Sequence, residues 1–97
     1  MSLRVVWTKQ ADAQLDEVYE YISQDNPVAA DGQLQLIGNA VQNLGNFPEL
    51  GRTGRRDGTR EVVIPGTPYI VVYRIRLASV RVLSVIHGAR RWPHRFR

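Results

Sequence analysis

Residues 60–87 decide the fold, and their sequence is REVVIPGTPYIVVYRIRLASVRVLSVIH. The apolar pattern in this stretch has period 2 and is rich in Val, Ile and Tyr, which suits a pleated, half-buried surface. Residues 65–68 (Pro-Gly-Thr-Pro) have the composition of a turn, and residues 77–79 form a second, tighter connection. The pattern predicts strands over residues 60–64, 69–76 and 80–87, joined as a three-stranded antiparallel meander.

The residues before this meander have a helical apolar spacing instead. Thr8 can cap a helix over residues 9–24, and Asn26 followed by Pro27 can start a second helix over residues 27–44. Gly45 is the expected C-cap of the second helix. The apolar stripes that predict the two helices are Ala11, Leu15, Val18, Tyr19 and Ile22, and then Ala30, Leu34, Ile37, Val41 and Leu44.

The remaining segments complete a single α+β domain over residues 1–97. Residues 3–7 predict a short N-terminal strand, and residues 45–59 predict a loop rich in Gly and Arg. The expected order is an N-terminal strand, a helical hairpin and a meander, with both helices packed on one face of the sheet in two layers. Gly32 and Gly38 weaken the second helix, and we expect them to allow close packing against the first.

Charge is divided unevenly between the two halves of the chain. Residues 1–50 carry two basic and seven acidic side chains, whereas residues 51–97 carry eleven arginines against Asp57 and Glu61. The two halves therefore have net charges of −5 and +9. Such a basic half favours a polyanion or an acidic protein segment as partner, because arginine forks match phosphates and carboxylates.

Composition excludes several functional classes. There is no Cys, so a disulfide framework, a thiolate zinc site and a catalytic thiol are excluded. Two histidines are too few for a histidine metal site, and we expect no metal and no cofactor. No apolar run approaches the roughly 20 residues of a membrane span, and the N-terminus lacks the apolar core of a signal peptide. We therefore expect a cytoplasmic protein that does not bind a membrane.

Strand alternation assigns the arginines to faces. In residues 69–76, Arg74 and Arg76 share a face with Ile70 and Val72, while Tyr69 and Tyr73 share the other face and are expected to pack. In the last strand the same rule groups Arg81, Leu83, Val85 and His87. We predict one basic binding surface, with Trp92 as an aromatic anchor for the tail. Its residues are Arg52, Arg55, Arg56, Arg60, Arg74, Arg76, Arg81, Arg90, Arg91 and Trp92.

A catalytic acid–base group is harder to find. His87 is the only imidazole near a strand end and could titrate near neutrality, or it could simply cap the sheet with a hydrogen bond. If the protein is a nuclease, His87, Arg60 and Arg81 are the candidate catalytic residues. Asp57 and Glu61 flank Arg60, so a role as salt-bridge partners is expected for them.

Two sequence segments resemble one known family. Residues 58–75 (GTREVVIPGTPYIVVYRI) and residues 80–93 (VRVLSVIHGARRWP) resemble the RelE/ParE superfamily of type II toxin–antitoxin toxins, and the ending HGARRWP resembles its ParE branch. The resemblance covers nearly the whole chain. It implies the RelE/ParE-like fold and a bacterial toxin that a cognate antitoxin neutralises by wrapping its C-terminal segment around the toxin. It also implies a toxin dimer bridged by antitoxins, a heterotetramer.

The superfamily contains two activities, and the resemblance favours one of them. RelE-like members cleave mRNA on the ribosome, whereas ParE-like members inhibit DNA gyrase without chemistry of their own. The positions that carry arginine in the RelE pattern fall at Ile70 and near Gly88, and its C-terminal tyrosine falls near His94. We therefore expect a non-enzymatic, ParE-like gyrase inhibitor. An mRNA endoribonuclease remains the alternative, and a degenerate toxin that only binds antitoxin and represses an operon is a second alternative.

Overall fold

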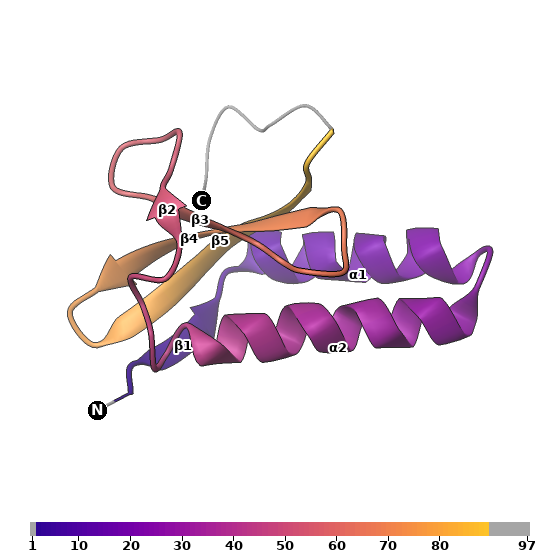
Figure 1. The fold of residues 1–97 in the computed structure, drawn as a ribbon, viewed down its shortest axis with the longest axis horizontal. Helices are drawn as coiled ribbons and strands as arrows, with labels where there is room; N and C mark the ends of the chain where they lie inside the picture. Colours follow the sequence, from indigo (N-terminus) through magenta and orange to yellow (C-terminus); the bar gives the residue numbers. More distant parts are fainter. Residues whose placement is uncertain (1, 90–97) are drawn as a thin grey trace.

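Two helices cover one face of a five-stranded sheet in the computed structural model, which describes residues 2–89 (Figure 1). The sheet has the strand order β1-β5-β4-β3-β2. All its neighbours are antiparallel except β1 and β5, which are parallel. The elements are β1 (Arg4–Trp7), α1 (Lys9–Ser23), α2 (Pro27–Asn43), β2 (Arg52–Thr53), β3 (Arg60–Val63), β4 (Tyr69–Arg76) and β5 (Ser79–His87).

The α+β architecture predicted from the sequence is confirmed, with two additions. The meander β3-β4-β5 has the predicted order and antiparallel pairing. Within the stretch predicted to be only loop, residues 52–53 form the edge strand β2 beside β3. The N-terminal strand β1 joins the same sheet at its other edge, beside β5.

Side chains cap both helices as predicted. Thr8 Oγ1 accepts a hydrogen bond from the Ala11 N–H at 3.2 Å, and Asn26 Oδ1 accepts one from the Ala29 N–H at 3.1 Å. These oxygens satisfy N–H groups that have no partner within the helix. Both helix starts are therefore fixed by local sequence.

The roles predicted for three glycines in and after the second helix are wrong. The C-cap of α2 is Leu44 rather than Gly45. A Cβ at Gly45 would lie 2.6 Å from the Leu3 carbonyl oxygen, so Gly45 is needed where the chain passes the start of β1. Close packing does not explain Gly32 and Gly38, because a Cβ at either position would meet nothing within 4 Å.

The helix-facing side of the sheet carries most of the core. Tyr69, Val71, Val82 and Val85 pack there with apolar residues of α1 and α2, and Tyr73 and Val80 pack with Leu44. Tyr69 and Tyr73 are buried, which confirms that both pack. The opposite side, here called the outer face, carries a smaller buried cluster of Val72, Leu83 and Ile86.

A β-bulge in β5 makes the predicted face assignment of the last strand wrong. Val72 pairs with Ser84 and Tyr73 pairs with Val82, so Leu83 is an extra residue without a partner in β4. Leu83 stays on the outer face, but Val85 lies in the main core and His87 pairs with Tyr69 on the helix-facing side. An extra residue reverses the alternation beyond it.

Gln14 of α1 stabilises this bulge. Its side-chain oxygen accepts hydrogen bonds from Ser84 Oγ at 2.7 Å and from the Val85 N–H at 2.9 Å. Ser84 is fully buried, so both donors depend on Gln14 for a partner.

Gln14→Leu should lower the free energy of unfolding by about 1–3 kcal/mol, because it leaves buried donors of β5 without an acceptor. Gln35→Leu is the matched control, since Gln35 is exposed on α2. Urea denaturation of both variants measures the difference. Equal stability of the two variants would mean that Gln14 does not hold the bulge.

Candidate functional site

Arginines from four strands occupy the outer face of the sheet. Arg74 of β4 is registered directly opposite Arg81 of β5, and Arg76 is opposite Ser79. Ser79 is in turn registered with Arg4 of β1, which places Arg4 on the same face. Arg52 of β2 pairs with Glu61, whose other neighbour is Val72 of the outer face. We call Arg4, Arg52, Arg74, Arg76 and Arg81 the outer arginines.

Few carboxylates neutralise the outer arginines. Arg52 forms a salt bridge with Glu61, with 3.2 Å between Nη2 and Oε1. No carboxylate among residues 2–89 forms an ion pair with Arg4, Arg76 or Arg81. Two like charges directly opposite each other in a sheet are destabilising, so the Arg74–Arg81 pair lowers stability in the free protein. A bound anion would remove this repulsion.

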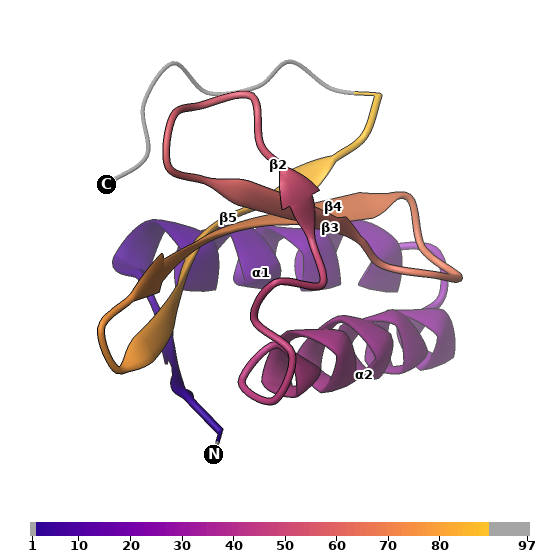
Figure 2. The same cartoon turned by 60° about the vertical axis from the view of Figure 1, so that its left-hand side comes forward.

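The loop over residues 54–59 rises above the outer face, away from the helices (Figure 2). The buried Glu61 carboxylate holds its start, because Oε2 accepts the Arg55 N–H at 2.7 Å. Arg74 Nη2 donates to the Asp57 carbonyl oxygen at 3.3 Å. Arg55 and Arg56 are exposed on this loop, on the same side as the outer arginines. Contrary to the expectation that it pairs with Arg60, Glu61 pairs with Arg52.

Aliphatic side chains fill the other end of the outer face. Ile70 is registered with Ile86, beside the cluster of Val72 and Leu83. A Cβ at Gly88 would lie 3.6 Å from Ile70 Cδ1, so Gly88 and Ile70 are neighbours. The resemblance places the RelE arginines at Ile70 and near Gly88, and these two uncharged residues lie side by side.

Arg60 lies on the opposite side of the sheet from the outer arginines. It is registered with Tyr73 and Thr53, on the helix-facing side. Its Nη1 donates to the Gly51 carbonyl oxygen at 2.8 Å and to the Glu49 carbonyl oxygen at 3.4 Å. The structure thus separates Arg60 from the single basic surface predicted from the sequence.

The hydroxyl of Tyr73 fixes the loop that holds Arg60. It donates to the Pro48 carbonyl oxygen at 2.7 Å and accepts the Gly51 N–H at 2.8 Å. Burial raises the pKa of the Tyr73 hydroxyl above its ordinary value, against the opposing effects of the Gly51 hydrogen bond and the Arg60 charge. A Cβ at Gly51 would lie 2.7 Å from this hydroxyl, so the contact requires glycine.

His87 caps the end of the sheet. Its Nδ1 accepts the Ala89 N–H at 3.1 Å, and its ring meets Tyr69 edge-on with centroids 5.5 Å apart. Tyr69 and Tyr73 are four residues apart on β4, so the Cα atoms of their partners His87 and Arg60 are at least about 13 Å apart. Arg81 lies on the other face. Acid–base catalysis needs groups within hydrogen-bond reach of one substrate, and the structure does not bring these three together.

The remaining predicted site residues, Arg90, Arg91 and Trp92, lie outside the described residues, as does His94. Arg4 was not predicted as part of the site. Its position follows from the parallel pairing of β1 with β5, which the sequence pattern does not reveal. Within residues 2–89, no cluster of three His, Asp or Glu side chains could hold a metal ion. No helix in that range is long and apolar enough to span a membrane.

A model of one protein family matches most of the chain. It describes the ParE toxin of the type II toxin–antitoxin system parDE and matches residues 5–92. The chain belongs to the ParE toxin family. It is therefore a toxin of a type II toxin–antitoxin system, and this family implies a cognate antitoxin as partner.

Two curated relatives match nearly the full length of this ParE family member. A Sinorhizobium fredii protein named "Putative toxin Y4kP" is 43% identical over 90 residues, covering 93% of both chains. Toxin RelE2 of Caulobacter vibrioides is 33% identical over 87 residues, covering 90% of this chain and 97% of its own. Both names agree with a toxin of the wider ParE/RelE superfamily.

Solved structures show the same fold at lower sequence identity. A chain of a chromosomal ParDE system from P. aeruginosa has a TM-score of 0.80 at 24% identity, covering 89% of this chain and 96% of that one. A chain of the YoeB dimer from Staphylococcus aureus has a TM-score of 0.57 at 15% identity, covering 87% and 94%. The first of these is the better match to the ParE family fold described here.

Tyr73→Phe should lower the free energy of unfolding by about 1–3 kcal/mol, because Pro48 O and Gly51 N–H lose their buried partner. Tyr19→Phe is the control, since the Tyr19 hydroxyl makes no hydrogen bond with another described residue. Thermal or urea denaturation near neutral pH measures both. A loss no larger than in the control would show that the hydroxyl does not stabilise the loop.

The same tyrosine predicts a pH dependence. Because its pKa is raised in the folded state, the unfolded chain releases the proton first as the pH rises above about 10. The stability contributed by Tyr73 is therefore present below that pH and is lost above it. Wild-type stability should fall more steeply than that of Tyr73→Phe as the pH rises above about 10. Parallel slopes in urea titrations would contradict this origin.

Proposed function

We propose that this ParE family toxin inhibits DNA gyrase by binding to it, without catalysing a reaction, and that the antitoxin blocks this binding. The observation that carries the proposal is the uncharged pair Ile70 and Gly88 on the outer face. A nuclease stabilises the charge that develops on the scissile phosphate with preorganised cations. An isoleucine and a glycine occupy the positions from which the RelE pattern implies that those cations come.

The wide separation of His87, Arg60 and Arg81 supports the same conclusion. One ring nitrogen of His87 already accepts a backbone hydrogen bond, which is the structural role considered for it from the sequence. The outer arginines remain, and they can bind anions but cannot serve as a general acid or base, because arginine stays protonated at any physiological pH. We propose that they bind an acidic surface of gyrase or of the antitoxin, or the DNA held by gyrase.

An mRNA endoribonuclease is the second candidate, because a relative 33% identical to this chain is named RelE2. A degenerate toxin that binds antitoxin without arresting growth is the third. We further propose a heterotetramer of two toxins and two antitoxins, which light scattering of the purified complex would test by mass.

Two assays on toxin purified away from its antitoxin should separate these functions. We expect inhibited gyrase supercoiling and intact mRNA in a ribosome-programmed translation reaction. His87→Ala should keep its inhibition of supercoiling within about twofold, because this His takes no part in the proposed mechanism. Normal supercoiling together with cuts at defined codons would replace the proposal by the nuclease. Antitoxin binding without either activity would indicate the degenerate toxin.

Charge reversal should test the outer arginines. Arg81→Glu is expected to slow association with the antitoxin and to reduce its salt dependence, because exposed charges act mainly on the rate of encounter. Lys9→Glu reverses the same charge on α1, away from the outer face, and should leave the rate unchanged. Surface plasmon resonance at low and high salt gives both rates. Equal association rates for Arg81→Glu and the wild type at low salt would exclude this face as the docking surface.

A further inference from the structure

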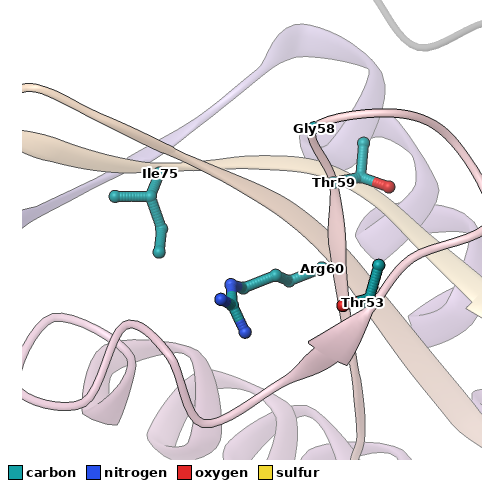
Figure 3. Close-up of a pocket in the computed structure, with 5 residues that line it drawn as sticks. All are labelled: Thr53, Gly58, Thr59, Arg60 and Ile75. Carbon is teal, nitrogen blue, oxygen red and sulfur yellow. The ribbon is translucent and has the colours of Figure 1, made fainter.

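A pocket lies on the helix-facing side of the sheet, at the place where β2, β3 and β4 run side by side. Its volume is about 240 Å³, and its lining residues are Thr53, Gly58, Thr59, Arg60 and Ile75. Figure 3 shows the Arg60 guanidinium projecting into the space between Ile75 and Thr53. The outer arginines project from the other face, and only Arg74 comes near the pocket, with its Nε 3.7 Å from where a Cβ on the lining residue Gly58 would lie.

Arg60 is held in place before any ligand arrives. Its Nη1 donates to the Gly51 and Glu49 carbonyl oxygens, and the Tyr73 hydroxyl fixes the same loop through Gly51 and Pro48. These contacts use one nitrogen of the guanidinium. Nε and Nη2 form no hydrogen bond with another described residue, so two coplanar donors remain for a ligand. Such a fork matches the two oxygens of a carboxylate.

The size and charge of the pocket limit what can fill it. Cofactor and drug-sized ligands occupy pockets of roughly 300–1,000 Å³, so this one is too small for them. Among the described residues, Arg60 is the one cation that lines the pocket, and Ile75 adds an apolar wall. A nucleic-acid backbone needs several cations along its length, and the outer arginines face the other way. A side chain with a single carboxylate on an aliphatic stem matches both features, because the carboxylate can pair with Arg60 and the stem can pack against Ile75.

We infer that the Arg60 pocket receives one Glu or Asp side chain from a bound protein segment, and that this segment belongs to the antitoxin. The choice of the antitoxin rests on the proposed function, whereas the carboxylate specificity rests on the pocket alone. Because Arg60 is partly buried and already oriented, its contact should control how long the partner stays bound rather than how fast it arrives.

The carboxylate specificity is tested on the free toxin by NMR titration of the arginine Nε–Hε resonances. The probes are glutamate blocked at both ends by acetyl and methylamide groups, the same derivative of glutamine, and dimethyl phosphate. Blocked glutamate should shift the Arg60 resonance saturably and bind at least about tenfold more tightly than blocked glutamine, as a charge-assisted hydrogen bond requires. The Arg76 resonance is the internal control. No saturable shift at Arg60, or an equal response to dimethyl phosphate, would overturn the inference.

The antitoxin as the source of the carboxylate is tested on the toxin–antitoxin complex. Arg60→Lys keeps the charge but loses the planar fork, so dissociation should accelerate about tenfold with little change in association. Lys9→Arg exchanges the same two cations on α1, away from the outer face, and should change neither rate. Unchanged dissociation in Arg60→Lys would exclude the antitoxin as the source. Failed gyrase inhibition would refute the proposed function but would not affect the titration result. If Arg60→Lys does not fold, the titration of the wild type still tests whether the pocket binds a carboxylate.

Discussion

The hydroxyl of Tyr73 joins the sheet to the loop on which both sides of the site depend. A buried hydroxyl lowers stability unless it is hydrogen-bonded, and this one donates to Pro48 and accepts from Gly51. The segment so fixed leads directly into β2 and supplies the carbonyl oxygen that orients Arg60. Arg52, the next residue, reaches the outer face and pairs with Glu61. One tyrosine in the middle strand therefore positions arginines on both faces of the sheet.

The parts of the fold that short-range chemistry determines were predictable from the sequence. The N-caps of both helices, the meander and the order of its strands depend on neighbouring residues, and the structure has them as predicted. The pairing of β1 with β5 was not predictable, because it joins segments about 75 residues apart and leaves no periodic signal in either. The bulge at Leu83 was missed for the same reason: the oxygen that stabilises it belongs to Gln14 on α1. Local alternation therefore misassigned Val85 and His87.

The candidate site was predictable in composition but not in arrangement. The excess of arginine in residues 51–97 predicted a binding surface, yet a charge count does not say which face each side chain occupies. Register supplies that information. It adds Arg4, which lies in the acidic half of the sequence, and it removes Arg60, which is adjacent to Glu61 in sequence but projects to the other side. The absence of charge at Ile70 and Gly88 was visible from the sequence; that the two positions touch was not.

The two faces differ in the kind of electrostatic interaction they offer. The outer arginines are mostly exposed, and within residues 2–89 only Arg52 has a carboxylate partner, so they attract anions over about a Debye length and salt weakens this attraction. Arg60 is recessed, held by backbone carbonyl oxygens and limited to one ligand, so it acts only at contact. Arg52 and Thr53 are consecutive residues of the edge strand β2, one on each face. A single partner segment that contacted both Arg52 on the outer face and the Arg60 pocket on the other face could do so by passing over the β2 edge. At this edge the two faces are separated only by the two residues of β2.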